Sequence, residues 1–179
     1  MPEGVEGWKD FENWVFRTIK ILFSGSLTNP QLHPNPACVQ RRDIVATNAA
    51  ERGFWKRVYD DYRTRQVVFE IKNSQELEND DFRQALSYSG RDYGNFVAII
   101  YRDDNYRLVE KYRNWVKEIW NQHNKLIFVI PDSFLVRCVR KLRNPKRHDY
   151  TEDALGKRLD TFVRSYLAIR QRPSPKKQK

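Results

Sequence analysis

The sequence predicts an α/β protein in which a central mixed β-sheet of four to five strands is flanked by helices. Short apolar runs rich in β-branched residues alternate with amphipathic helical patterns along the chain, and this alternation is typical of a sheet covered on both faces. Hydrophobic residues make up 40% of the 179 positions, and 5 Trp, 9 Tyr and 10 Phe supply large apolar rings. This composition is sufficient for the core of one domain of ordinary size and argues against global disorder.

The first third of the chain is expected to contain a helix, a loop, a strand and a second helix. Apolar residues between positions 8 and 22 recur at intervals of three and four, which is typical of one face of an amphipathic helix. Three prolines within residues 29–36 predict a loop. Residues 38–47 (CVQRRDIVAT) are expected to form a strand. Apolar residues spaced by four favour a helix within 48–66, although Gly53 weakens that pattern.

The rest of the chain is expected to alternate between strands and helices. Residues 65–73 (RQVVFEIKN) form the clearest strand, because β-branched and aromatic residues fill their apolar run. The continuous apolar runs 95–101 (NFVAIIY) and 126–130 (LIFVI) are typical of strands buried on both faces. Helical spacing and helix-start residues predict helices near 80–89, 108–120, 131–143 and 151–171.

The excess positive charge is confined to the last quarter of the chain. Between Arg137 and Lys179 there are 14 Lys or Arg against 4 Asp or Glu, which accounts for the whole net charge of +10. We expect residues 1–143 to form the main domain, 144–171 a basic helix packing on or extending it, and 172–179 a disordered basic tail. The asymmetry indicates a polyanion partner such as nucleic acid, and a solvated helix with a soluble tail explains it equally well.

The sequence also predicts a cytoplasmic protein without a membrane partner. No run of about 18 apolar residues is present, which excludes a transmembrane helix. The amino-terminal MPEGVEGWKD lacks the basic and apolar regions of a secretory signal. Cys38 and Cys138 are too few for a disulfide framework and lack metal-site spacing, as expected in a reducing compartment.

Two acidic residues occupy strand candidates that otherwise consist of apolar residues. Glu70 lies within 65–73, and Asp43 directly precedes Ile44-Val45. A carboxylate in a buried strand is costly unless it is paired or binds a cation. Glu70 and Lys72 are two residues apart and therefore point to the same face, although an edge strand facing water would give the pair no role. Two carboxylates from adjacent strands would form a hard-oxygen site suited to Mg²⁺.

The set Asp43 and Glu70-Ile71-Lys72 resembles the motif of the PD-(D/E)XK nuclease superfamily, which has the restriction-endonuclease-like fold. The resemblance extends over roughly residues 8–101. It implies that Asp43, Glu70 and the carbonyl of Ile71 bind Mg²⁺, for which Mn²⁺ may substitute, and that Lys72 completes the catalytic set with Asp43 and Glu70. It further implies a DNA endonuclease of defence, restriction or DNA processing, acting on double- or single-stranded DNA as a homodimer or in a larger defence or repair complex.

Five further residues are candidates by the same resemblance. Glu12 matches a first-helix glutamate that faces the metal in Mrr-like branches of the superfamily, and a solvent-facing glutamate explains it equally well. Gln84-x-x-x-Tyr88 resembles a motif of RecB-like nucleases, and its spacing places both side chains on one helix face, where they could touch DNA. Arg41 and Arg42 could contact phosphate or simply flank the sheet.

Two departures from the superfamily pattern and one rival function complete the interpretation. No proline precedes Asp43, and residues 48–66 are longer than a tight hairpin, which suggests a helical insertion over the active site. His33, His123 and His148 show no metal-ligand spacing, so they are given no role. The alternative function is a non-cleaving module that binds nucleic acid or docks a partner, and the intact catalytic set argues against it.

Overall fold

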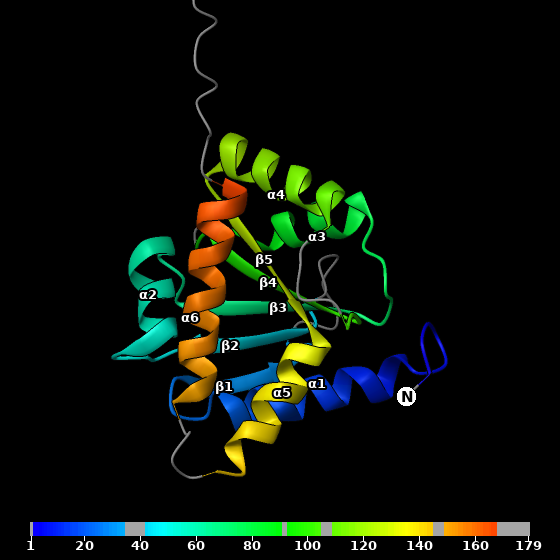
Figure 1. Ribbon diagram of the computed structural model, residues 1–179, viewed down its shortest axis with the longest axis vertical. Coiled ribbons are helices and arrows are strands. Elements are labelled where there is room, and N and C mark those ends of the chain that lie inside the picture. The colour runs from blue at the N-terminus through cyan, green and yellow to red at the C-terminus, as the bar shows by residue number, and fades with distance from the viewer. Residues whose placement is uncertain (1, 35–41, 91–92, 105–108, 145–148, 168–179) are drawn as a thin grey trace, which may run out of the picture.

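A five-stranded mixed β-sheet flanked by helices forms the protein, so the predicted α/β class is confirmed. The computed structural model describes residues 2–34, 42–90, 93–104, 109–144 and 149–167 (Figure 1). In chain order the elements are α1 (Trp8–Leu22), β1 (Leu27–Leu32), β2 (Ile44–Asn48), α2 (Gly53–Tyr62), β3 (Gln66–Lys72), α3 (Asn79–Tyr88), β4 (Phe96–Tyr101), α4 (Glu110–His123), β5 (Leu126–Pro131), α5 (Asp132–Leu142), α6 (Tyr150–Phe162) and the π-helical turn η2 (Val163–Leu167).

The strands lie in the order β1-β2-β3-β4-β5, with an antiparallel half and a parallel half. β1, β2 and β3 pair antiparallel, whereas β3, β4 and β5 pair parallel. In the parallel half, Lys72 pairs with Tyr101, and Tyr101 pairs with Pro131. The carboxyl ends of β3, β4 and β5 therefore share one edge of the sheet with the amino end of β2.

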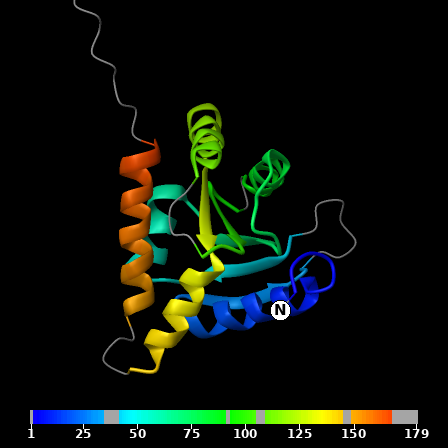
Figure 2. The ribbon, with the colours of Figure 1, turned by 45° about the vertical axis from the view of Figure 1, so that its right-hand side comes forward.

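Helices cover both faces of the sheet. On one face, Trp55 of α2 packs on Phe69 of β3, with ring centroids 5.8 Å apart, and the rings of Phe128 and Phe162 lie 5.5 Å apart. On the other face, Tyr112 of α4 packs against Tyr101 of β4 at 6.3 Å. Figure 2 shows α2 and α6 on one side of the sheet and α3 and α4 on the other. This double cover explains the continuous apolar runs of β4 and β5, whose residues are all buried.

The prediction of a loop throughout residues 29–36 is wrong, because residues 27–32 form strand β1. Strand β1 (LTNPQL) contains Pro30, but it is an edge strand, where a proline removes no ladder bond. The register with β2 shifts between Thr28 and Gln31, which accommodates the proline. The strand predicted over residues 38–47 corresponds to β2, which begins at Ile44. Residues 38–41 of that prediction lie outside the described residues.

The segment 48–66 contains the predicted helix, α2. The prediction that this helix lies over the active site is wrong. The connection leaves β2 at Asn48 and enters β3 at Gln66, which is the end of these antiparallel strands opposite Asp43. Gly53 is the first helical residue, with a positive φ of 75°, so its low helix propensity costs little there. The following backbone N–H, of Phe54, donates a 3.0 Å hydrogen bond to a carboxylate oxygen of α6.

The carboxyl-terminal helix α6 packs into the same core as the sheet. Leu155, Leu159 and Phe162 of α6 are buried, and Arg57 of α2 forms a 2.6 Å ion pair with Asp160. The predicted tail 172–179 and the last residues of the predicted helix lie outside the described residues. Among the described residues, no helix is both long enough and apolar enough to cross a membrane.

Candidate active site

A cleft of about 870 Å³ opens at the edge of the sheet where β3 ends. Five of the predicted site residues line it, namely Asp43, Glu70, Ile71, Lys72 and, on α3, Gln84. Gly4, Val5 and Glu6 and the first residues of α1 also line it. The predicted catalytic set therefore meets in one cavity, although Asp43 and Glu70 lie far apart in the sequence.

Asp43 lies directly before β2 and is held between β1 and β3. Its side chain accepts a 2.7 Å hydrogen bond from the backbone N–H of Ile71, and its own carbonyl accepts one of 2.8 Å from the N–H of His33. The residue is only 8% exposed. A carboxylate thus takes the place of a backbone acceptor at the end of the β2–β3 ladder, which explains why an acidic residue is tolerated beside Ile44. Because the N–H and C=O of one strand residue point to the same side of the strand, the Ile71 carbonyl also faces Asp43.

Glu70 and Lys72 point to the same face of β3 and form an ion pair in which Glu70 is buried and Lys72 is partly exposed. The Lys72 ammonium lies 2.8 Å from Glu70 Oε1 and 3.0 Å from Asp81 Oδ1. It also donates a 2.9 Å hydrogen bond to Gln84 Oε1. The three N–H bonds of the ammonium can thus be satisfied by three acceptors, two of them from α3. This arrangement holds Lys72 beside the carboxylate of Glu70.

The surroundings of Glu70 make its ionised form unfavourable. Burial and the nearby Asp43 raise the pKa of Glu70 to about 7, against the opposing effect of Lys72. Glu70 is 1% exposed, and its Oε2 atom accepts no hydrogen bond from the described residues. Burial by itself would lower the pKa of Lys72, but Glu70 and Asp81 together raise it above its usual value. A cation bound between Asp43 and Glu70 would compensate both carboxylates, so the residues present fit a divalent metal.

The raised pKa of Glu70 predicts that the metal-free protein loses stability as the pH rises. The folded protein binds this proton more tightly than the unfolded chain does, since its pKa is about 7 rather than 4.5. The contribution to the free energy of unfolding should therefore fall by up to about 3 kcal/mol as the pH rises through this interval. Lys72 stays charged throughout it. Urea unfolding in EDTA at pH 5 and pH 8 should show this loss, and Glu70→Gln should remove it; the same loss in that variant would contradict the assignment.

Of the predicted nucleic-acid-binding residues, one lines the cleft and others pack beside it. Gln84 lines the cleft, and its amide donates a 2.6 Å hydrogen bond to the hydroxyl of Tyr88. Tyr88 is buried, and burial together with the charge of Glu70 raises its pKa to about 12. The Arg42 guanidinium lies over the rings of Tyr88 and Tyr93, at 5.5 Å and 4.1 Å from their centroids. Gln84 is thus placed for contact with a ligand in the cleft, whereas Arg42 packs on rings beside it, and Arg41 lies outside the described residues.

Glu12 and His33 meet beside Asp43. Glu12, on α1, is 3% exposed, so the interpretation of it as a solvent-facing glutamate is wrong. Its Oε2 atom lies 2.9 Å from His33 Nε2, and one ligand atom each of Glu12, His33 and Asp43 lie within 4.8 Å of one another. His33 is not among the predicted site residues. Its spacing to the other two residues carries no signal, and it follows β1, a strand that the local pattern does not predict.

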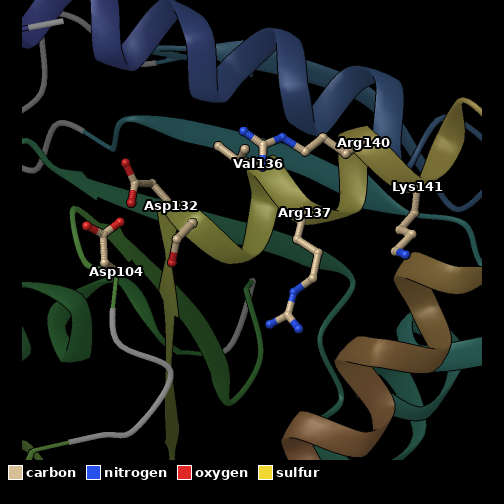
Figure 3. Close-up of a pocket in the computed structure, with 7 residues that line it drawn as sticks. Asp104, Asp132, Val136, Arg137, Arg140 and Lys141 are labelled. Atoms are coloured by element: carbon tan, nitrogen blue, oxygen red, sulfur yellow. The ribbon is translucent and has the colours of Figure 1, made fainter.

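A second cavity, of about 620 Å³, lies along α5. Figure 3 shows Asp104 and Asp132 near each other at one end of it, and Arg137 and Lys141 further along the helix. Arg140, one turn beyond Val136, adds a third cation to the lining. Three cations of the predicted basic segment thus lie at a place separate from the cleft.

Comparison with known proteins provides one informative similarity. The chain is similar to the transposon gamma-delta 80.3 kDa protein of Escherichia coli (strain K12), with 43% identity over 171 residues. The match takes in 95% of this chain but 24% of the E. coli protein, so the chain spans about a quarter of that relative. No protein-family model matches the sequence, and no solved structure matches it. The chemical assignment of the cleft therefore rests on its own residues.

Proposed function

We propose that the protein is a metal-dependent nuclease of the PD-(D/E)XK type that hydrolyses phosphodiester bonds in DNA. The observation that carries the proposal is the buried pair Asp43 and Glu70 beside Lys72 in an open cleft. Two carboxylates at this position cost stability unless a cation joins them, and the buried Oε2 atom of Glu70 accepts no hydrogen bond from the described residues. The order of α1, the β1–β3 meander, α3 and β4 agrees with the core that the superfamily resemblance implies.

Each residue of the cleft has a distinct role in this mechanism. Asp43, Glu70 and the carbonyl of Ile71 would hold Mg²⁺ or Mn²⁺, which supplies charge stabilisation at the phosphate and a more acidic bound water. Lys72 places its ammonium next to that position, where it orients the attacking water and stabilises negative charge as it develops on the phosphate. Gln84 holds the Lys72 ammonium through its 2.9 Å hydrogen bond and could release it to contact the substrate.

DNA is the proposed substrate, and the cytoplasm the proposed location. The similar E. coli protein carries a transposon in its name, and a transposon is a DNA element, which favours DNA over RNA. Defence, restriction or DNA processing are the settings we propose for the activity, with a homodimer or a larger complex as the working form.

The direct test is a cleavage assay on supercoiled plasmid and on single-stranded DNA, with Mg²⁺, Mn²⁺ or EDTA. We expect cleavage with either metal and none with EDTA. Binding of DNA without cleavage in any metal would overturn the proposal and favour the alternative, a non-cleaving nucleic-acid-binding or partner-docking module.

The cations on α5 should govern DNA affinity rather than chemistry. Each phosphate neutralised on duplex DNA contributes about −0.9 to the slope of log K against log salt. Replacing Arg137, Arg140 and Lys141 by Gln should therefore make the slope shallower by up to about 2.7. Cleavage at low salt should stay near the wild-type rate. Fluorescence anisotropy with a labelled duplex across a salt series measures the slope.

A matched control removes three charges elsewhere. Lys20, Lys56 and Lys117 lie on α1, α2 and α4, and their replacement by Gln lowers the net charge equally. An equal change of slope in both triple variants would show that only the total charge matters. Truncation before α6 is a poorer test, because it also removes the buried residues Leu155, Leu159 and Phe162.

A further inference from the structure

We propose that His33 is a metal ligand, and that Glu12, His33 and Asp43 form a second cation position that favours transition metals. The inference deepens the proposed function and rests on it in one respect, because Asp43 would serve both positions. It assigns to a histidine a role that neither the sequence pattern nor the comparisons indicate.

The spacing of the three ligand atoms suits a metal ion. Two ligand atoms that bind one ion at right angles, each about 2.1 Å from it, lie about 3.0 Å apart. Glu12 Oε2 and His33 Nε2 are 2.9 Å apart, and the group that includes Asp43 fits within 4.8 Å. The three residues reach this point from different elements: α1, the end of β1 and the start of β2. Figure 1 shows α1 running alongside β1, which brings the first two together.

His33 is held in one orientation by its own contacts. Its backbone has a positive φ of 48°, and its N–H donates a 2.8 Å hydrogen bond to the Asp43 carbonyl. The imidazole stacks on the ring of Trp8, with centroids 6.1 Å apart and planes inclined by 18°. The side chain is 19% exposed and that of Glu12 is 4% exposed. A preorganised and largely buried imidazole that faces two carboxylates is a favourable metal ligand, since little ordering is needed on binding.

This position is distinct from the one between Asp43 and Glu70. Among the described residues, the group of ligand atoms within 4.8 Å of one another contains Glu12, His33 and Asp43 but not Glu70. Glu70 Oε1 is instead paired with Lys72. Two cations that share Asp43 would form the arrangement of two-metal phosphodiesterases, whose ions lie about 3.5–4 Å apart. The imidazole nitrogen should make the His33 position bind Co²⁺ or Zn²⁺ most strongly, with Mn²⁺ weaker than these but still preferred over Mg²⁺, which favours oxygen ligands.

The rival explanation is that Glu12 and His33 only form a hydrogen-bonded pair that stabilises the fold. In that case Mn²⁺ would bind through oxygen atoms alone. Electron spin-echo spectroscopy separates the two explanations, because a directly bound imidazole modulates the Mn²⁺ signal through its ¹⁴N nucleus. The readout needs no DNA and no cleavage.

The experiment uses the full chain, freed of metal with EDTA and then loaded with Mn²⁺. We expect nitrogen modulation in the wild type and its loss in His33→Asn, with Mn²⁺ affinity at that position at least about ten-fold weaker. Asparagine tolerates the positive φ of residue 33, so the backbone should be preserved. His123→Asn, at the exposed end of α4, is the matched control and should keep the nitrogen signal. A wild-type spectrum without nitrogen modulation, or modulation that persists in His33→Asn, would overturn the inference.

One further variant separates this inference from the proposed function. Glu70→Gln disables the other cation position, so it should abolish cleavage and keep the nitrogen signal. If the wild type cleaves DNA but shows no bound nitrogen, the inference fails and the nuclease stands. If it binds Mn²⁺ through nitrogen but cleaves nothing, the metal site stands and the nuclease fails. Should His33→Asn not fold, the wild-type spectrum still decides the question.

Discussion

Glu70→Gln should abolish metal-dependent DNA cleavage while leaving the protein folded. The substitution keeps the shape of the side chain and removes the negative charge that a cation needs. We expect a rate loss of at least about 10³-fold, equivalent to about 4 kcal/mol of transition-state stabilisation. Stability at neutral pH should be unchanged or higher, because burial and Asp43 already raise the pKa of Glu70 to about 7.

Asp43→Asn is the parallel variant and should lose cleavage to a similar extent. The asparagine oxygen can still accept the hydrogen bond from the Ile71 N–H, which is 2.7 Å in the native protein. Alanine at this position would leave that buried N–H without its acceptor, at a cost of about 1–3 kcal/mol, so lost activity and lost stability would be confused.

The measurement is nicking of supercoiled plasmid with Mg²⁺, accompanied by thermal melting of each variant. Asp80→Asn is the control, since Asp80 is an exposed carboxylate on α3. Wild-type cleavage by folded Glu70→Gln or Asp43→Asn protein would show that the cleft is not the active site.

Lys72→Met should lose cleavage and keep its metal. Methionine retains much of the apolar stem but removes the ammonium that would orient water and stabilise charge on the phosphate. A loss of about 10²–10³-fold is expected, as for other single groups that stabilise developing charge. An ammonium cannot ligate a cation, so Mn²⁺ should still bind.

The pH of this binding measurement matters. Lys72 lowers the pKa of Glu70 from the value that burial and Asp43 would produce. Its removal should raise the pKa of Glu70 above about 7, so metal binding, which needs the carboxylate, should shift to higher pH. Calorimetric titration with Mn²⁺ should therefore be carried out well above neutral pH. Loss of Mn²⁺ binding there, with Asp43→Asn unaffected, would exchange the roles given to these residues.

The local sequence pattern predicts most accurately those strands whose residues are buried along their whole length. β3, β4 and β5 lie within one residue of their predicted bounds, because both faces of the sheet are covered and the apolar runs are continuous. The local pattern does not predict β1, because Pro30 is compatible with a strand at an edge but not in the middle of a sheet. Strand order is not encoded in a local window, so neither that edge nor the position of α2 could be inferred from the residues around them.

That Glu70 and Lys72 share a face of one strand follows from the residue order alone, because side chains alternate with a period of two. The sequence also marked Asp43 as anomalous beside an apolar pair, and the superfamily resemblance joined the three residues into one predicted site. The surroundings of these residues depend on the folded arrangement: Asp81 and Gln84 of α3 hold the lysine, and His33 lies beside Asp43. Such contacts depend on the order of the strands and the packing of helices across them, and these arise from the burial of apolar surface over the whole chain rather than from any motif.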